Sequence, residues 1–388
     1  MEDKILIIGN GFDLYHRLPT RYSDFMFFAS SWNSFYMSYV SSQNYTGTME
    51  QITVPLTEKG ELTHEALQEF GRHAYLFNEG HISFLKQHLQ SNTWIKCFEG
   101  IEYKDKKWLD FEQEIQNVLY DAEEYSMKVL PQKVGEKGAE GLPDSLARIP
   151  HIFGDAARNG YVNLGEVEVL EEYVDKHMLQ HQKELLIEFM LQELNNLIQC
   201  LQYYLDDFVS NIKIDCFSEQ IRDLGELYIL NFNYTNTFTN VYGKNYVLEQ
   251  HSVHGGIVNS DIVLGISDEA FPDTYDYIRF QKYFQRIQKR TGAYYKLWLL
   301  RHSTNAIGGI VPKHVYIFGH SLGLADYGVL NDIYNNKDVN KITIYYHSQS
   351  SYEDIVINLV KALKKEIVIE WIGNHKIELI QLQPAVNS

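Results

Sequence analysis

The sequence has no apolar run long enough to cross a bilayer, and it contains very little cysteine. The first apolar run, residues 5–8, is far shorter than the about 18 residues of a spanning helix, and no cleavage site of a signal peptide follows it. The three cysteines, Cys97, Cys200 and Cys216, are far apart and form no CxxC pair. This spacing argues against a disulfide framework and a structural zinc site. We therefore expect a reduced, cytoplasmic protein with no membrane contact and no bound metal.

Positive charge is also scarce. The 388 residues include 34 Lys and Arg against 51 Asp and Glu, which gives a formal net charge of −17. A field of this sign repels a phosphate backbone, so we expect no general nucleic-acid binding. Apolar residues make up 45% of the chain and aromatic residues 14%. A chain of this length and composition can bury one large core or two modest ones.

Segments that are typical of strands lie at the two ends of the chain. Most are short β-branched apolar runs, and several end in Asn or Gly, which suits parallel strands that feed loops at their carboxyl ends. Residues 350–364 read as a helix between two late strands, which completes a βαβ unit. The sequence therefore predicts an α/β fold with a mainly parallel sheet. The predicted strands are residues 5–8, 226–231, 246–253, 261–265, 314–319, 341–347 and 366–372, with 376–382 as an edge strand.

The middle of the chain has helical rather than strand periodicity. Apolar residues recur at three-or-four spacing most clearly over residues 166–209, and residues 127–163 read as a loop with short helices. We predict a Rossmann-like nucleotide-binding domain formed by residues 1–50 and 218–388. Residues 51–217 would then be a large helical insertion in it.

The first predicted strand runs directly into a glycine turn, Gly9-Asn10-Gly11. If a helix opens at this turn, its free N–H groups and positive dipole end form a seat for an anion such as a pyrophosphate. The dinucleotide fingerprint requires a third glycine where Leu14 stands, and Asp13 places a negative charge nearby. The turn alone therefore leaves two interpretations open, a nucleotide site and a simple tight turn.

Two further clusters follow predicted strands. Asn231 and Asn233 stand in an Asn- and Thr-rich turn, where an amide could orient a ribose or a water; such a turn also commonly caps a helix. His254 precedes two glycines and would titrate near neutral pH beside a ligand. The alternative for His254 is a buried imidazole that is satisfied by a carbonyl group.

A third cluster, Gly319-His320-Ser321, could donate backbone N–H groups to a phosphate. It also belongs to a G-x-S-x-G pattern, which is the nucleophile elbow of α/β-hydrolases. A serine hydrolase built on Ser321 would leave the Gly9 and Asn233 turns without a role, but it stays open as an alternative. Its acid and histidine would come from residues that follow the serine, namely Asp326, Asp338, Asp354, His347 and His375.

Taken together, these segments resemble the AbiH family of bacterial phage-abortive-infection proteins, and the resemblance spans nearly the whole chain. It implies an antiviral defence role, with a phage-derived trigger and a homo-oligomer as expected partners. The motifs that carry it are IIGNGFDLxHxLPTxYSDF at residues 7–25, WxDFE at 108–112, NFNYTNTF at 231–238, VHG at 253–255, LGI at 264–266 and IFGHSLGxAD at 317–326.

The same motifs, in the same order, are more distantly similar to the sirtuin-type NAD-binding fold. That family's catalytic Asn matches Asn233, and the His of its H-G pair matches His254. The resemblance implies a sheet that binds NAD at its carboxyl edge, with Asn233 and His254 as catalytic residues. The residues that it implies for NAD binding are Gly9, Asn10, Gly11, Phe12, Asp13, Asn233, Gly319, His320 and Ser321.

One departure from the sirtuin pattern bears on the reaction. Sirtuin deacylases carry a four-cysteine zinc module between the H-G and G-T-S segments, and the corresponding interval here contains no cysteine. This argues against protein deacylation. Zinc-free relatives in bacterial immunity are typically NAD hydrolases, so the resemblance implies hydrolysis of the nicotinamide–ribose bond. A nucleotide-binding sensor or partner-binding module that does not turn NAD over stays open beside it.

Overall fold

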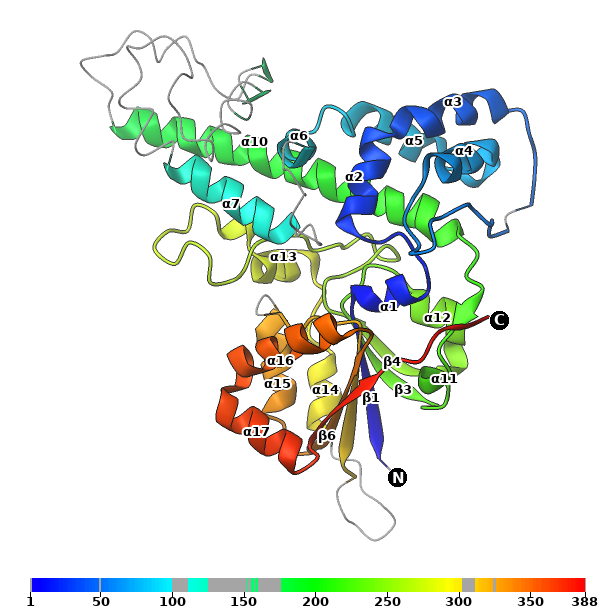
Figure 1. Ribbon diagram of the computed structural model, residues 1–388. Coiled ribbons are helices and arrows are strands. Elements are labelled where there is room, and N and C mark those ends of the chain that lie inside the picture. Colours follow the sequence, from blue (N-terminus) through cyan, green and yellow to red (C-terminus); the bar gives the residue numbers. More distant parts are fainter. Residues whose placement is uncertain are drawn as a thin grey trace.

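The centre of the protein is a six-stranded sheet in the order β4-β3-β1-β5-β6-β7, in which every neighbouring pair is parallel (Figure 1). The computed structural model describes residues 2–48, 50–99, 111–124, 152, 155–156, 158–159, 176–301, 311–323 and 326–387. The predicted α/β class with a mainly parallel sheet is confirmed. The strands are β1 (Asp3–Ile8), β3 (Leu227–Asn231), β4 (Val247–Ser252), β5 (Lys313–Phe318), β6 (Val339–Tyr346) and β7 (Ile377–Gln381).

Strand β1 is buried on both faces of the sheet, which explains its continuous apolar sequence. Ile5 and Ile7 pack into the core on one face, and Leu6 and Ile8 pack into the core on the other. Helices cover both faces (Figure 1). The first face carries α14 (Tyr295–Leu300), α15 (Tyr327–Tyr334), α16 (Gln349–Leu363) and α17 (Lys365–Gly373), and the second carries α1 (Asn10–Tyr15), α11 (Glu219–Arg222) and α12 (Thr237–Tyr242).

Two of the predicted strands are wrong. Residues 366–372 lie in helix α17, where Val368 packs against the sheet and Ile369 is 71% exposed. Their β-branched composition is typical of strands, but it also serves a short helix that covers a sheet face. Residues 261–265 form no strand: they are largely buried outside the sheet, and Val263 N–H donates to His254 O. The predicted helix at 350–364 and the edge strand at 376–382 are confirmed as α16 and β7.

A body of helices lies beyond the carboxyl ends of the strands (Figure 1). Its longest member, α10 (Lys176–Tyr203), continues into a π-helical turn at Tyr204–Phe208. Its core also takes in side chains from residues 18–39 and 257–280, and the predicted division of the chain into domains stays a prediction. The other helices are α2 (Tyr22–Ser30), α3 (Trp32–Ser42), α4 (His64–Arg72), α5 (Glu79–His88), α6 (Thr93–Glu99), α7 (Phe111–Glu124) and α13 (Lys282–Lys289).

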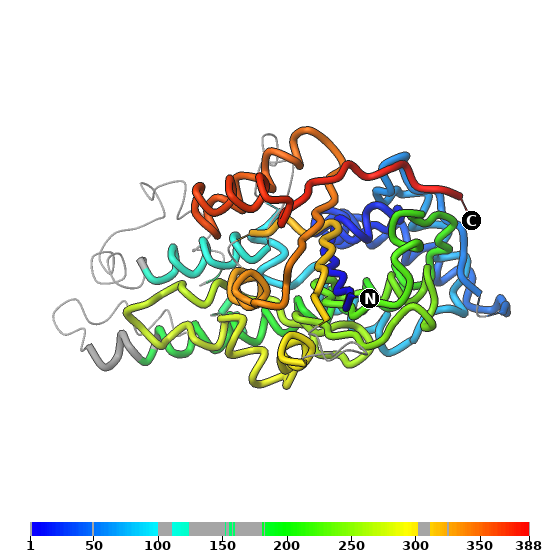
Figure 2. The backbone as a smooth tube through the Cα atoms, turned by 90° about the horizontal axis from the view of Figure 1, so that it is seen from below, coloured from blue at the N-terminus to red at the C-terminus, as the bar shows by residue number. Residues whose placement is uncertain are grey.

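The end of the chain returns to the second face of the sheet, which α1, α11 and α12 cover. After β7 it runs past the sheet edge, and β8 (Val386–Asn387) pairs antiparallel with β2 (Cys216–Phe217) (Figure 2). No helix in the described ranges is both long enough and apolar enough to span a bilayer. Most of the predicted loop at 127–163 lies outside the described residues.

Candidate functional site

The turns after β1 and β5 touch each other directly. Gly11 N–H donates to Gly319 O at 2.8 Å, and Gly9 N–H donates to Phe318 O at 3.1 Å. Gly319 has a φ of 69°, and a Cβ on it would lie 2.2 Å from Phe12 N. These glycines therefore let two backbones meet, and the N–H groups of Gly9 and Gly11 are used inside the protein. A phosphate would have to displace these bonds to use the same N–H groups, and the NAD-binding role of this turn stays a prediction.

Asn233 and Asp13 meet directly above the end of β1. Asn233 Nδ2 donates to Gly9 O at 3.0 Å and to Asp13 Oδ1 at 3.1 Å. The other oxygen of Asp13 accepts a bond from Thr235 Oγ1 at 2.7 Å, and Thr237 Oγ1 lies 3.0 Å from that hydroxyl. The turn that carries Asn233 is itself held by Asn231, whose Oδ1 accepts from Asn233 N–H. The structure thus joins the first two sequence motifs through one carboxylate.

Asp13 is 1% exposed. Burial raises its pKa to about 6, although the hydrogen bonds from Thr235, Thr237 and Asn233 oppose the shift. Its carboxylate is bonded to uncharged donors from the Asn233 turn. The negative charge that argued against a nucleotide at this turn is therefore buried against these donors.

His254 lies two residues after β4 and is 6% exposed. Its Nε2 lies 2.9 Å from Asp326 Oδ1, an ion-pair distance, although the ring N–H is not aligned for a formed hydrogen bond. The second oxygen of Asp326 lies 3.4 Å from His320 Nε2. The Phe232 ring stands edge-on to both imidazoles, with centroid distances of 5.5 Å to His254 and 4.3 Å to His320. One carboxylate therefore faces two histidines at the carboxyl edge of the sheet.

A buried lysine completes this group. Lys282 on α13 is 2% exposed, and its Nζ lies 2.7 Å from Glu112 Oε2 on α7 and 3.4 Å from Asp326 Oδ1. We call His254, Asp326, Lys282 and Glu112 the buried charge network. It connects the edge of the sheet with two helices of the helical body.

The network sets the charge of each member. Burial and the Lys282 cation lower the pKa of His254 to about 4, and Asp326 offsets only part of this shift. Burial would raise the pKa of Asp326, but Lys282 and His254 outweigh it and hold the pKa well below its usual value. Burial likewise opposes the charge on Lys282, and the Asp326 and Glu112 carboxylates hold its pKa above normal. Near pH 7 His254 is therefore neutral beside an ionised carboxylate, and a neutral imidazole can accept a proton.

The contacts sort the predicted residues into two groups. Gly9, Asp13 and Asn233 form one group, while His254 and His320 form the other through Asp326. No hydrogen bond joins Asn233 and His254 in the described part of the chain. Phe232 links the two groups, because it adjoins Asn233 in the chain and packs against both histidines.

The serine-hydrolase alternative gains no support from the described contacts. Ser321 is exposed and its carbonyl oxygen accepts a bond from Asn358 Nδ2 at 2.8 Å. No histidine among the described residues hydrogen-bonds its hydroxyl. His320 Nδ1 instead accepts from Leu322 N–H at 2.9 Å, so the adjacent imidazole faces its own turn.

Sequence reasoning missed Lys282 and gave Glu112 no role beyond a motif. Lys282 carries no sequence signal, because a lysine in a helical pattern ordinarily reads as a solvated face. Glu112 belongs to the WxDFE motif, whose Trp108 and Asp110 lie outside the described residues. Asp326 was considered only as the acid of a serine hydrolase, and the structure places it against His254 instead.

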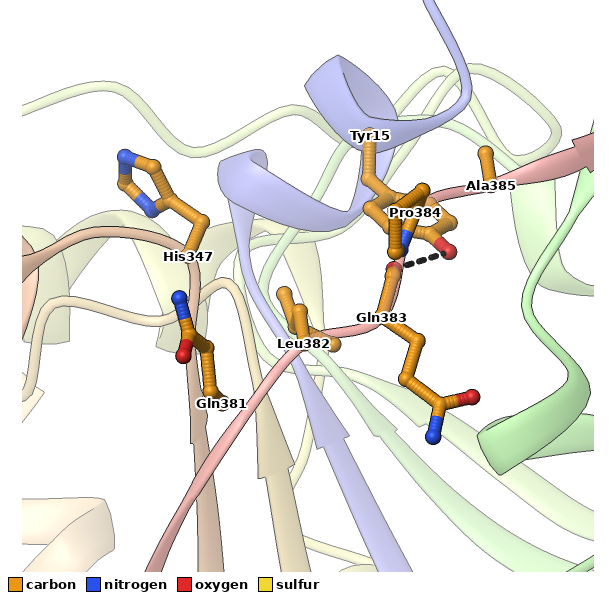
Figure 3. Close-up of a pocket in the computed structure, with 7 residues that line it drawn as sticks. All are labelled: Tyr15, His347, Gln381, Leu382, Gln383, Pro384 and Ala385. Atoms are coloured by element: carbon orange, nitrogen blue, oxygen red, sulfur yellow. Dashed lines mark hydrogen bonds between the residues drawn. The ribbon is translucent and has the colours of Figure 1, made fainter.

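A cavity of about 690 Å³ lies at the same edge of the sheet, beyond the ends of β6 and β7 (Figure 3). Tyr15 at the end of α1 borders it, and the Tyr15 hydroxyl donates to Gln383 O at 3.0 Å. Its size and its place at the carboxyl edge of the sheet suit part of a small ligand. It is lined by Tyr15, His347, Gln381, Leu382, Gln383, Pro384 and Ala385.

Among the described residues, three side chains of metal-ligand type come together in the helical body, at His81, Asp206 and Asp207. Their ligand atoms all lie within 4.8 Å of one another. His81 Nδ1 already lies 3.0 Å from Asp207 Oδ2. A hydrogen bond between His81 and Asp207 therefore accounts for two of the three side chains.

Comparison with known proteins gives one result. The model of the family described as bacteriophage abortive infection AbiH matches residues 5–348. No curated protein and no solved structure matches the chain significantly. The matched segment contains the glycine turn, Asn233 and the whole buried charge network. The chain belongs to the AbiH family of bacteriophage abortive-infection proteins.

Proposed function

We propose that the protein is an abortive-infection effector that hydrolyses the nicotinamide–ribose bond of NAD. The observation that carries the proposal is the neutral, buried His254 beside an ionised Asp326 at the carboxyl edge of the sheet. A neutral imidazole can take a proton from water as a general base, and the adjacent carboxylate would stabilise the imidazolium that forms.

The order of the strands supports a nucleotide as the ligand. If the six strands of the sheet are numbered along the chain, they lie in the order 3-2-1-4-5-6, which is that of the doubly wound dinucleotide-binding fold. In such sheets the ligand binds where the strand order reverses, outside the carboxyl ends. Here that point lies between β1 and β5, where the Gly9 and Gly319 turns meet. We therefore propose a Rossmann-like, sirtuin-type site at this edge.

The proposed reaction adds water across the N-glycosidic bond. Water oxygen forms a bond to ribose C1′, the C1′–N bond breaks, and its electron pair leaves with nicotinamide, which becomes neutral. His254 accepts the proton that water loses, and the products are ADP-ribose and nicotinamide. The transition state has oxocarbenium character, as in glycoside hydrolysis. Asn233 would orient a ribose hydroxyl or the water, and the turns at Gly9 and Gly319 to Ser321 would adjoin the phosphates.

A direct assay tests this proposal. Purified protein is incubated with NAD, alone and with lysate of phage-infected cells, and nicotinamide and ADP-ribose are quantified by chromatography. We expect release that is lost in Asn233→Ala and His254→Ala and kept in Ser321→Ala. The infected lysate covers the case in which a phage component triggers the enzyme or drives its assembly into a homo-oligomer.

Two results would favour the alternatives. NAD binding without turnover, in the presence of infected lysate, would indicate a nucleotide-binding sensor. Ester hydrolysis that is lost in Ser321→Ala would indicate a serine hydrolase. Either result would contradict the assignment of His254 as the base of NAD hydrolysis.

A further inference from the structure

The side-chain amide of Asn233 is held in one orientation. Both of its Nδ2 hydrogens have acceptors, Gly9 O at 3.0 Å and Asp13 Oδ1 at 3.1 Å. Rotation of the amide by 180° would place its oxygen against two other oxygens, which is unfavourable. The acceptors thus select the orientation on chemical grounds, and Asn233 itself is 6% exposed.

This orientation leaves the amide oxygen for a ligand. In the described ranges no protein group donates a hydrogen bond to Asn233 Oδ1, and this oxygen is not among the fully buried side-chain atoms that lack a partner, so a ligand can reach it. The backbone beneath it is fixed as well, because Asn231 Oδ1 accepts from Asn233 N–H at 2.9 Å and Asn231 Nδ2 donates to Thr235 O at 2.9 Å. What Asn233 presents is therefore an acceptor, held by its neighbours.

We propose that Asp13 is a positioning residue, which fixes Asn233 so that its amide oxygen accepts a hydrogen bond from a hydroxyl of the ligand. The ligand group that suits this acceptor is a ribose hydroxyl or the attacking water. This role rests on the proposed function of Asn233 in NAD hydrolysis. Gly9 O alone would bind one hydrogen of the amide, and the amide could then still rotate out of this orientation.

The chain offers a conservative variant that separates positioning from charge. In Asp13→Asn the new oxygen can accept from Asn233 Nδ2, and the new amino group can donate to Thr235 Oγ1, whose own hydrogen then turns to Thr237 Oγ1 at 3.0 Å. Every bond of the cluster survives. In Asp13→Leu a side chain of similar size removes both acceptors.

Thr235→Val is a matched control, because Thr235 binds the other oxygen of the same carboxylate. Thr235→Val removes the bond to Asp13 Oδ2 but leaves the bond between Asp13 and Asn233. If Asp13 merely stabilised the turn, Thr235→Val would reduce turnover to the same extent as Asp13→Leu. If Asp13 positions Asn233, only Asp13→Leu should reduce it.

The test measures kcat for NAD hydrolysis and the side-chain amide signals of Asn233 in protein labelled with ¹⁵N-asparagine. We expect a loss of about 100-fold in kcat for Asp13→Leu, which is the usual effect of a misplaced catalytic contact. Asp13→Asn and Thr235→Val should stay within about threefold of the wild type. A folded Asp13→Leu with full turnover, or an Asp13→Asn as inactive as Asp13→Leu, overturns the proposal.

The amide signals separate this proposal from the proposed reaction. In wild type and Asp13→Asn we expect one well-dispersed pair of Asn233 NH₂ signals, and in Asp13→Leu a shifted or averaged pair. If the wild type hydrolyses no NAD even with infected lysate, the reaction fails but the signals still decide the positioning role. Signals in Asp13→Leu that match those of the wild type overturn the positioning role, whatever the activity.

Discussion

Replacement of Lys282 by methionine tests the buried charge network. Lys282 Nζ lies 2.7 Å from Glu112 Oε2 and 3.4 Å from Asp326 Oδ1, and the side chain is 2% exposed. Methionine has a similar length and no charge, so the packing of the stem is largely kept. The two carboxylates lose their cation and face each other across an apolar group.

The expected destabilisation follows from how little water reaches the network. The side chains of Glu112 and Asp326 are 18% and 16% exposed, so solvent replaces the lost cation poorly. Removal of one partner from a buried ion pair typically costs about 3–5 kcal/mol of unfolding free energy. We expect Lys282→Met to fall in this range at pH 7.

Lys183 provides a matched control. Its Nζ also bridges two carboxylates, Glu123 at 2.6 Å and Asp276 at 2.7 Å, and its own side chain is 8% exposed. The two acids are more exposed, at 27% and 32%, so water can solvate them after the change. Lys183→Met should therefore cost only about 1 kcal/mol.

Two measurements test the predicted difference between Lys282→Met and Lys183→Met. Urea unfolding gives the free energies of the wild type and of both variants, and NMR titration of histidine ring signals gives the pKa of His254. Since the Lys282 cation helps to lower that pKa to about 4, Lys282→Met should raise it and Lys183→Met should leave it unchanged. Equal destabilisation by the two variants, with an unchanged pKa of His254, would refute our account of the network.

Three further predictions concern the glycine turn, the buried aspartate and the helical body. Gly319→Ala should cost about 1–2 kcal/mol for its positive φ and about 1–3 more for the clash with the facing turn. Gly225→Ala, with a φ of 75° and nothing within 4 Å of a Cβ, should cost only the first amount, and equal melting temperatures would contradict the turn contact. Burial raises the pKa of Asp13 from 3.8 to about 6, so the folded state binds its proton more tightly and stability is lost as pH rises through this window. In urea unfolding Asp13→Asn should gain about 2 kcal/mol relative to the wild type between pH 4 and pH 7, and a gain independent of pH would contradict the sign. Tyr204→Phe removes the 2.7 Å bond from the buried hydroxyl to Pro19 O and should cost about 1–3 kcal/mol, since the carbonyl loses its partner; an unchanged melting temperature would show that water replaces it.

The sheet could be predicted wherever a strand is buried on both faces. Residues 5–8 and 315–318 are continuous apolar runs that are each followed by a glycine, and this pattern is typical of strands buried on both faces. Residues 366–372 carry the same β-branched signal but form α17, because a short helix that covers a sheet can use these residues equally well. Local preference does not distinguish the two cases. The neighbouring elements decide between them, and they become known only with the fold.

The site could be predicted only where a motif marks the end of a strand. Asn233 and His254 follow β3 and β4 and stand in short, unusual sequences. Lys282 stands in an ordinary helix, and what distinguishes it is the pair of carboxylates that reach it from α7 and from the start of α15. A buried charge is stable only through such partners. The partners of Lys282 lie outside its own helix, so the sequence of that helix does not predict its role.

The sequence marked the turn at Gly9 to Gly11 as important, but it did not reveal what the turn contacts. The glycines there left a nucleotide site and a simple tight turn as open interpretations, and in the structure they allow a close contact with the Gly319 turn. Asp13, which argued against a ligand at this turn, is the residue that connects it to Asn233. If a nucleotide binds at this edge, the role of the turn is then to place Asp13 and Gly9 O beneath Asn233. Asp13→Leu should therefore impair the site even though the glycines and their N–H groups are untouched.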